Sequence, residues 1–247
     1  MINHYVRTYE SARRTIDNGL QRYMVKVYAH LASALLLTTL AAAVTVLYAP
    51  LTRLLFTCDA YGCRVGYTGL GWVVVFLPVG IAMYIRSKGD AISFTRSRLL
   101  LTIYAVLTGM SLSTLAFYYS IGSLYKTFLV AASTFGCTSV YGYVTNRDLS
   151  QVGSFCRMAI WGLIISSLVN LFFQSSAIDF AISFVGVGVF TFFVAYYTQQ
   201  LKSLYYEIQD SALAERAALM GAFLLYLNFL NIFIYLLRFF GERRRRD

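Results

Sequence analysis

Long apolar runs separated by short polar breaks dominate this chain of 247 residues. A helix needs about 20 predominantly apolar residues to cross the hydrocarbon core of a bilayer. Seven runs approach or exceed that length, at residues 27–48, 69–85, 99–119, 127–144, 155–173, 178–198 and 217–240. The breaks RSKGD, TNRDLS and QSS are rich in residues typical of loops. The pattern predicts an all-α integral membrane protein with seven transmembrane helices.

Polar stretches divide the chain further. We expect residues 1–23 to form a polar cytoplasmic segment, residues 24–241 the transmembrane domain, and residues 242–247 a basic tail. The polar stretch before the last run, QQLKSLYYEIQDSALAER, would place Leu201, Leu204, Tyr205 and Ile208 on one side of a helix. That spacing favours a short amphipathic helix at the membrane surface.

Composition agrees with the membrane interpretation. Hydrophobic residues make up 58% of the chain and charged residues only 13%, about half the share of a soluble domain. The net charge of +10 does not indicate nucleic-acid binding, because the basic residues lie at the ends of apolar runs. There they meet anionic lipid head groups, so the expected partner is the bilayer.

Basic residues also predict the orientation. Thirteen Lys and Arg flank the runs on the side of the N-terminus, against three on the other side before the C-terminal tail. The N-terminus is therefore expected to be cytoplasmic. The tail opposes this rule, because seven crossings would put Arg238 and residues 243–246 outside. Either these late charges do not override the orientation, or the last segment re-enters without crossing; we expect it to cross.

Cysteines and glycines add local expectations. Cys58 and Cys63 form CDAYGC in a loop on the predicted outer side, where their spacing allows a disulfide. A metal site is less expected, with two sulfurs and no nearby histidine. Glycines such as Gly109, Gly136 and Gly142 occur inside the runs, where small residues let helices pack closely.

The chain offers little for catalysis. It has two histidines, His4 and His30, and contains no HExxH, GxGxxG or P-loop motif. We expect no enzyme activity and no bound cofactor. The polar residues deep in the runs are neutral: Asn170, Tyr197, Gln199, Asn228 and Asn231. An amide in hydrocarbon is costly unless it is hydrogen-bonded, so these side chains should face protein.

Three stretches resemble the Bax inhibitor-1 family, also called the transmembrane BAX inhibitor motif family, and its bacterial members in particular. They are TFLVAASTFGCTSVYGYVTNRDLSQVGSF at residues 127–155, VFTFFVAYYTQQLK at 189–202 and GAFLLYLNFLNIFIYLLRFFG at 221–241. The similarity extends over about residues 24–241. It implies a seven-helix bundle with the last helix central, wrapped by the other six. It also implies a calcium leak tuned by pH, whereas some bacterial relatives are linked to control of a membrane-bound protease.

The resemblance assigns the pH response to two buried aspartates between the sixth and seventh helices. One belongs to a Tyr-Asp-Thr-Gln motif, which reads YYTQ here and places Tyr197 at the aspartate. The other belongs to a Leu-Tyr-Leu-Asp-Phe motif, which reads LYLNF and places Asn228 there. Arg86 matches the position of a basic residue expected to meet that pair; without carboxylates it should serve the cytoplasmic interface. Asn231 stands where the family motif is commonly Asn, so we expect it to be structural, as we do Gln199 and Asn170.

Loss of both carboxylates changes the expected activity. Asparagine does not titrate and an ordinary tyrosine titrates near 10, so the pair stays neutral at physiological pH. Tyr197 and Asn228 can still hydrogen-bond, which would keep the closed packing without a proton switch. Calcium prefers oxygen-rich, usually anionic sites, so such a chain would conduct it poorly. Two hypotheses remain: a calcium leak in a bacterial inner membrane without pH gating, and a non-conducting regulator that binds another membrane protein such as a protease.

Overall fold

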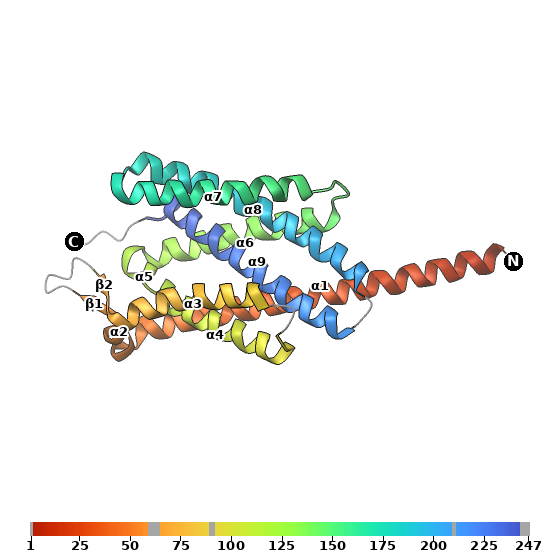
Figure 1. The fold of residues 1–247 in the computed structure, drawn as a ribbon, viewed down its shortest axis with the longest axis horizontal. Helices are drawn as coiled ribbons and strands as arrows, with labels where there is room; N and C mark the ends of the chain where they lie inside the picture. Colours follow the sequence, from red (N-terminus) through yellow and green to blue (C-terminus); the bar gives the residue numbers. More distant parts are fainter. Residues whose placement is uncertain (1, 59–64, 89–91, 209–210, 243–247) are drawn as a thin grey trace.

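The structure is a computed structural model that describes residues 2–58, 65–88, 92–208 and 211–242. Helices account for nearly all of these residues (Figure 1). They are α1 (Ile2–Leu47), α2 (Ala49–Leu55), α3 (Gly69–Lys88), α4 (Phe94–Leu112), α5 (Leu115–Tyr118), α6 (Ile121–Val144), α7 (Ser150–Phe173), α8 (Ser176–Glu207) and α9 (Ser211–Phe240). The strands β1 (Phe56–Cys58) and β2 (Val65–Tyr67) form an antiparallel hairpin that the sequence analysis missed. The runs of apolar residues thus fold as helices.

Local sequence explains several helix ends. Pro50 lies in the first turn of α2, where a missing N–H costs nothing. Ser120 caps α6 by accepting a hydrogen bond from the Ser123 N–H at 3.2 Å. The turn between α7 and α8 is made by Gln174 in the left-handed region (φ 48°), and the Asn170 side-chain oxygen accepts the Ser175 N–H at 3.0 Å. Pro50 and Ser120 thus mark the starts of α2 and α6, and Gln174 marks the end of α7.

The number of membrane spans is confirmed only in part. Among the described residues, five helical segments are long and apolar enough to cross a membrane: Asn18–Leu47, Phe94–Tyr118, Ser150–Phe173, Ser176–Glu207 and Ala212–Phe240. Gly69–Ile85 in α3 is apolar but shorter. Helix α6 has 24 residues, but its Ser, Thr and Gly residues make it less apolar. An all-α, multi-pass membrane protein is therefore supported, and the count of seven remains a prediction.

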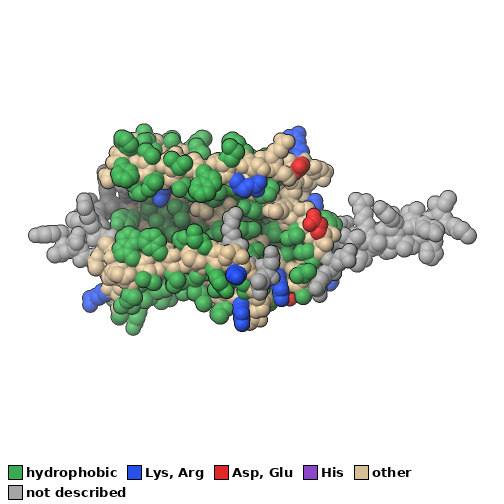
Figure 2. All heavy atoms as spheres, viewed as in Figure 1, with side chains coloured by type: hydrophobic (Ala, Val, Ile, Leu, Met, Phe, Trp, Pro, Cys, Tyr) green, Lys and Arg blue, Asp and Glu red, His purple; other side chains and the backbone are tan. Residues whose placement is uncertain are grey.

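Apolar side chains cover much of the outer surface. In α7, Phe155, Met158, Trp161 and Phe172 are each more than two-thirds exposed. Figure 2 shows such side chains across the middle of one face, with most of the visible Lys and Arg side chains toward the end from which α1 projects. Soluble proteins rarely expose continuous apolar patches of this extent. The surface is thus suited to lipid.

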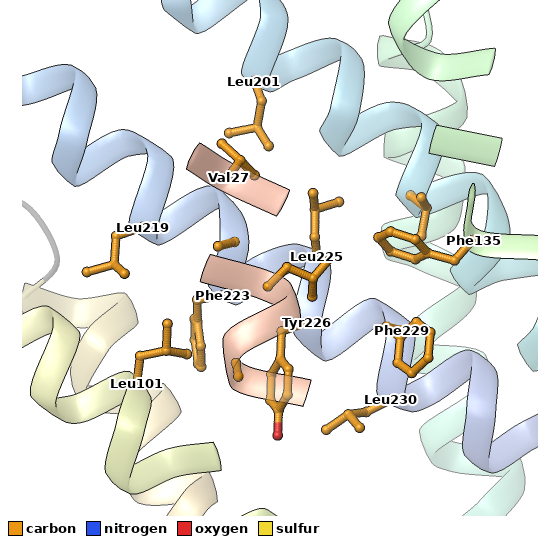
Figure 3. Packing of buried hydrophobic residues seen from close by; sticks show 14 of the residues in the cluster. Val27, Leu101, Phe135, Leu201, Leu219, Phe223, Leu225, Tyr226, Phe229 and Leu230 are labelled. Atoms are coloured by element: carbon orange, nitrogen blue, oxygen red, sulfur yellow. The ribbon is translucent and has the colours of Figure 1, made fainter. Parts of the chain in front are cut away.

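Helix α9 occupies the centre of the bundle. In its membrane-length window 61% of the residues are buried, against 39% or less in the other four candidate spans. Its chief neighbours are α8, α1 and α6, with α4 beside them, while α3 packs on α4 and α7 on α8. Figure 3 shows α9 side chains between Val27 of α1, Leu101 of α4, Phe135 of α6 and Leu201 of α8. The predicted central position of the last helix holds, although α3 and α7 form an outer layer.

Several helices continue past the predicted spans at one end of the bundle. We call the end that carries Lys26, Lys202 and Glu215 the inner end, and the other the outer end. Residues 199–207 continue α8 without a break, and Leu201 is only 5% exposed. The expected separate surface helix is therefore wrong: Leu201 and Tyr205 pack on the core because α8 continues past residue 198, where the predicted span ends.

Candidate functional site

Asn228 lies on the buried side of α9 near the middle of that helix. Its side chain is 5% exposed, and its amide donates to the Leu224 carbonyl one turn earlier at 2.7 Å. This bond satisfies a donor that would otherwise face an apolar interior. The amide therefore finds its partner within its own helix.

Tyr197 lies on α8 facing α9. Contacts of Gly221 with Leu201 and of Gly186 with the Tyr235 ring fix the antiparallel register of the two helices. This register puts Tyr197 beside Leu224, about one turn from Asn228 along α9. The Tyr197 ring stacks on Phe193, with centroids 5.4 Å apart. The hydrogen bond expected between Tyr197 and Asn228 remains a prediction.

Other predicted residues fall outside the described part. Cys63 and the side chains of Cys58 and Arg86 are not among the described residues. The proposed disulfide and the role of Arg86 therefore remain predictions. The β1–β2 hairpin does bring the Cys58 backbone opposite Val65.

Gln199 holds the connection between α6 and α7. Its side-chain nitrogen donates to the Arg147 carbonyl at 2.7 Å, and its oxygen accepts the Leu149 N–H at 2.9 Å. In the same loop Asp148 accepts the Ser150 N–H at 2.8 Å. Hydrogen bonds from the Ser150 side chain and backbone hold the pKa of Asp148 below its ordinary value, because they favour the charged form. This loop is the TNRDLS break, now tied to α8.

We predict that Gln199→Ala releases this loop. Two hydrogen bonds are lost and the Leu149 N–H is left without its acceptor, which costs about 1–3 kcal/mol locally. Hydrogen exchange by mass spectrometry should show faster exchange in peptides covering residues 145–152, and Gln200→Ala, one residue on and exposed, should not. Unchanged exchange in Gln199→Ala would contradict the tie.

The remaining amides serve local backbone. Asn231 donates to the Leu227 carbonyl at 2.8 Å, as Asn228 does to Leu224. Asn170 accepts the Ser175 N–H in the α7–α8 turn. These contacts fit structural roles for Asn231, Asn170 and Gln199.

Hydroxyl contacts between helices are a feature the sequence analysis missed. The Tyr226 hydroxyl of α9 lies 2.6 Å from Oγ1 of Thr38 in α1, and Thr38 also donates to the Ala105 carbonyl of α4 at 3.1 Å. Oγ of Ser139 in α6 lies 2.5 Å from the Tyr28 hydroxyl and 3.1 Å from Oγ1 of Thr198. Single hydroxyl residues are common in apolar runs, so sequence alone did not mark these as partners.

Within the described part of the chain, no charged side chain is buried in the interior. Among the side chains whose burial is described, the buried polar ones are all hydroxyl or amide groups. The searched residues also contain no group of three or more His, Cys, Asp or Glu suited to a metal ion. Two ion pairs lie at the ends of α9: Lys26 with Glu215 at 2.8 Å, and Arg238 with Asp179 at 4.0 Å. An ion inside the described part of the bundle would therefore meet only neutral oxygen atoms.

Known proteins match this chain over nearly its whole length. The family model described as "Inhibitor of apoptosis-promoting Bax1" matches residues 20–245. The chain belongs to this family, the Bax inhibitor-1 family. An uncharacterised protein of Rickettsia prowazekii is 44% identical over 237 residues, 96% of each chain. The inner membrane protein YbhL of Escherichia coli K12 is 37% identical over 228 residues, 92% of this chain and 94% of its own. An uncharacterised protein of Caulobacter vibrioides is 38% identical over 242 residues, 95% of this chain and 94% of its own.

The three Bax inhibitor-1 stretches pack together in the fold. Residues 127–155 cover most of α6, the following loop and the start of α7; residues 189–202 lie in α8; residues 221–241 cover most of α9 and the residue after it. Ser139, Thr198, Gln199 and Asn228 all belong to these stretches. The predicted recognition is thus confirmed, and the motifs form the α6–α8–α9 core.

Proposed function

We propose that this Bax inhibitor-1 protein is a slow calcium-permeable leak whose closed packing does not respond to physiological pH. One observation carries the proposal: the side chain at the family's carboxylate position, Asn228, is a buried amide bonded within its own helix. An amide carries no titrating proton, so protonation cannot break or make this contact. The calcium-leak activity itself comes from the family resemblance.

A second candidate function is a non-conducting regulator that binds another membrane protein. It is favoured by the interior, since the described buried side chains carry no charge and calcium binds weakly without anionic oxygens. In either case we propose a non-enzymatic role without a resident cofactor. The bilayer is the partner common to both.

Location and topology are part of the proposal. The YbhL relative is named an inner membrane protein, and all three relatives above are bacterial. We propose a bacterial inner membrane, with the inner end of the bundle in the cytoplasm because Lys and Arg are concentrated on that side. The α3 and α6 helices would be the second and fourth of seven spans, added to the five long apolar segments.

Calcium flux in proteoliposomes tests the main proposal. We predict a leak from the wild-type chain that changes little between about pH 6 and pH 8, the range where groups with pKa near 6.5 titrate. The Tyr197→Asp/Asn228→Asp variant should acquire a steep response, because two close carboxylates titrate as a coupled pair. Asn231→Asp is the matched control, with one aspartate a turn further along α9.

Two results would decide against it. His30 of α1 lies inside the first predicted span, and an ordinary histidine has a pKa near 6.5. A steep response of the wild-type chain that persists in His30→Gln would contradict pH-independent packing. No flux above empty liposomes at any pH would favour the regulator.

A further inference from the structure

A cavity of about 480 Å³ lies at the inner end of the bundle. It is lined by α3 and α4 on one side, by α8 on the other, and by the first half of α9. Ligand sites in proteins commonly enclose about 300–1,000 Å³, so this volume suits part of a small amphiphile. No motif in the sequence analysis pointed to it.

Its lining is apolar with one cation. Of the sixteen described lining residues, four carry a polar side chain: Ser97, Tyr197, Gln200 and Arg216. The others are aliphatic or aromatic apart from Gly221, and none of these lining residues is acidic. A positive charge beside apolar walls repels calcium and favours an anionic group joined to a hydrocarbon tail.

The cation and the apolar end are separated along α9. Arg216 is exposed near the start of α9, and Leu224 lines the cavity eight residues on. At 1.5 Å per residue this is a depth of about 12 Å. In a bilayer whose surface meets the inner end of the bundle, Arg216 would stand at the level of the head groups, and Leu224 and Tyr197 at the level of the acyl chains.

The arrangement of helices leaves this part of α9 open to the bilayer. Helix α3 packs chiefly on α4, and α7 on α8, so neither closes over α9. Figure 2 shows a recess along this face, between the elements above and below α9 in Figure 1. A lipid chain can enter sideways without crossing water.

We propose that this cavity binds one acyl chain of an anionic phospholipid from the leaflet at the inner end, with Arg216 pairing its phosphate. Ser97 and Gln200 supply further polar contacts to the head group. The chain end would lie against Leu224, whose carbonyl accepts the Asn228 amide. The proposal does not depend on calcium conduction.

Native mass spectrometry of the wild-type protein is the first test. Protein released from bilayers with equal amounts of phosphatidylglycerol and phosphatidylcholine of the same acyl chains should retain phosphatidylglycerol. We expect a preference of about fivefold, the contribution of one basic residue at an anionic surface. Equal retention, or a bound mass that fits only a free fatty acid, would overturn the proposal.

Tryptophan quenching locates the site. In a Trp72→Phe/Trp161→Phe background, Leu204→Trp places one fluorophore in the cavity lining, and Phe155→Trp places one on exposed α7 near the same end. Lipids brominated on the acyl chain should quench Leu204→Trp more strongly as phosphatidylglycerol than as phosphatidylcholine. Phe155→Trp should show little head-group preference.

Removing one charge completes the experiment. Arg216→Gln should abolish the preference at Leu204→Trp, while Arg147→Gln removes one exposed charge at the same end and should keep it. A preference that survives Arg216→Gln, or is equal in Phe155→Trp, would show only general attraction to basic protein and overturn the site.

Discussion

Replacing Gly142 of α6 by leucine should strongly reduce the yield of folded protein. A Cβ at this position would meet the Ala195 backbone of α8, 2.8 Å from its Cα. Backbone cannot move aside as a flexible side chain can, so the helices must separate. Overpacking costs about 1–3 kcal/mol even where neighbours relax, and more is expected here because the contact lies between the central helices.

Gly136 provides the control in the same helix. A Cβ there meets no atom within 4 Å, and the residue is exposed. Gly136→Leu should therefore leave stability close to wild type. Thermal unfolding in detergent, followed by size-exclusion chromatography, compares the two. Equal losses in both variants would contradict close α6–α8 packing at Gly142.

Replacing Tyr226 by alanine should produce the second large loss. This side chain is fully buried in α9, its hydroxyl bonds to Thr38, and its ring lies edge-on to Tyr104 with centroids 5.9 Å apart. Loss of a buried aromatic side chain costs about 3–5 kcal/mol through lost contacts and the cavity left behind. The thermal unfolding temperature of Tyr226→Ala should fall well below that of Tyr141→Ala, because Tyr141 of α6 is 52% exposed.

Tyr226→Phe separates the hydroxyl from the ring. The Thr38 hydroxyl can donate to the Ala34 or the Ala105 carbonyl, at 2.8 and 3.1 Å, which leaves its oxygen free to accept from the Tyr226 hydroxyl. Interhelical hydrogen bonds in membrane proteins contribute about 0.6 kcal/mol on average, so this variant should lose much less than Tyr226→Ala. A double-mutant cycle with Thr38→Ala measures the pair directly. Absence of coupling would assign the whole effect of Tyr226→Ala to packing.

Sequence reasoning reached the fold through hydrophobicity and the family motifs. Apolar runs predicted the helices because a bilayer leaves a chain few alternatives. The inner end of α8 was missed, because Leu201 and Tyr205 pack on α9 and α1 beyond residue 198, where the predicted span ends. The motifs identified Asn228 as buried, but not its partner: an amide in a helix can bond either to a neighbouring helix or to the carbonyl one turn back.

The sequence also could not predict contacts between distant segments, because a polar side chain in a helix can bond within its own helix or to a neighbour. Thr38 and Tyr226 are separated by 188 positions, and a threonine in an apolar run more often bonds to its own helix. The Arg216 cavity depends on how α3 and α7 are layered, which no local pattern records. Thus the apolar runs predicted which segments are helices, and only the structure joined their residues in pairs.

The ion pairs of α9 have a consequence for how this helix can be moved. Lys26–Glu215 and Arg238–Asp179 hold its two ends where side chains remain about half exposed, while the segment between them is buried among neutral groups. Salt and protons in either compartment therefore have access to the ends of the helix and not to its middle. A signal dissolved in water therefore acts on α9 only through the two ends of the helix. A signal carried by the bilayer can act on the side of the helix.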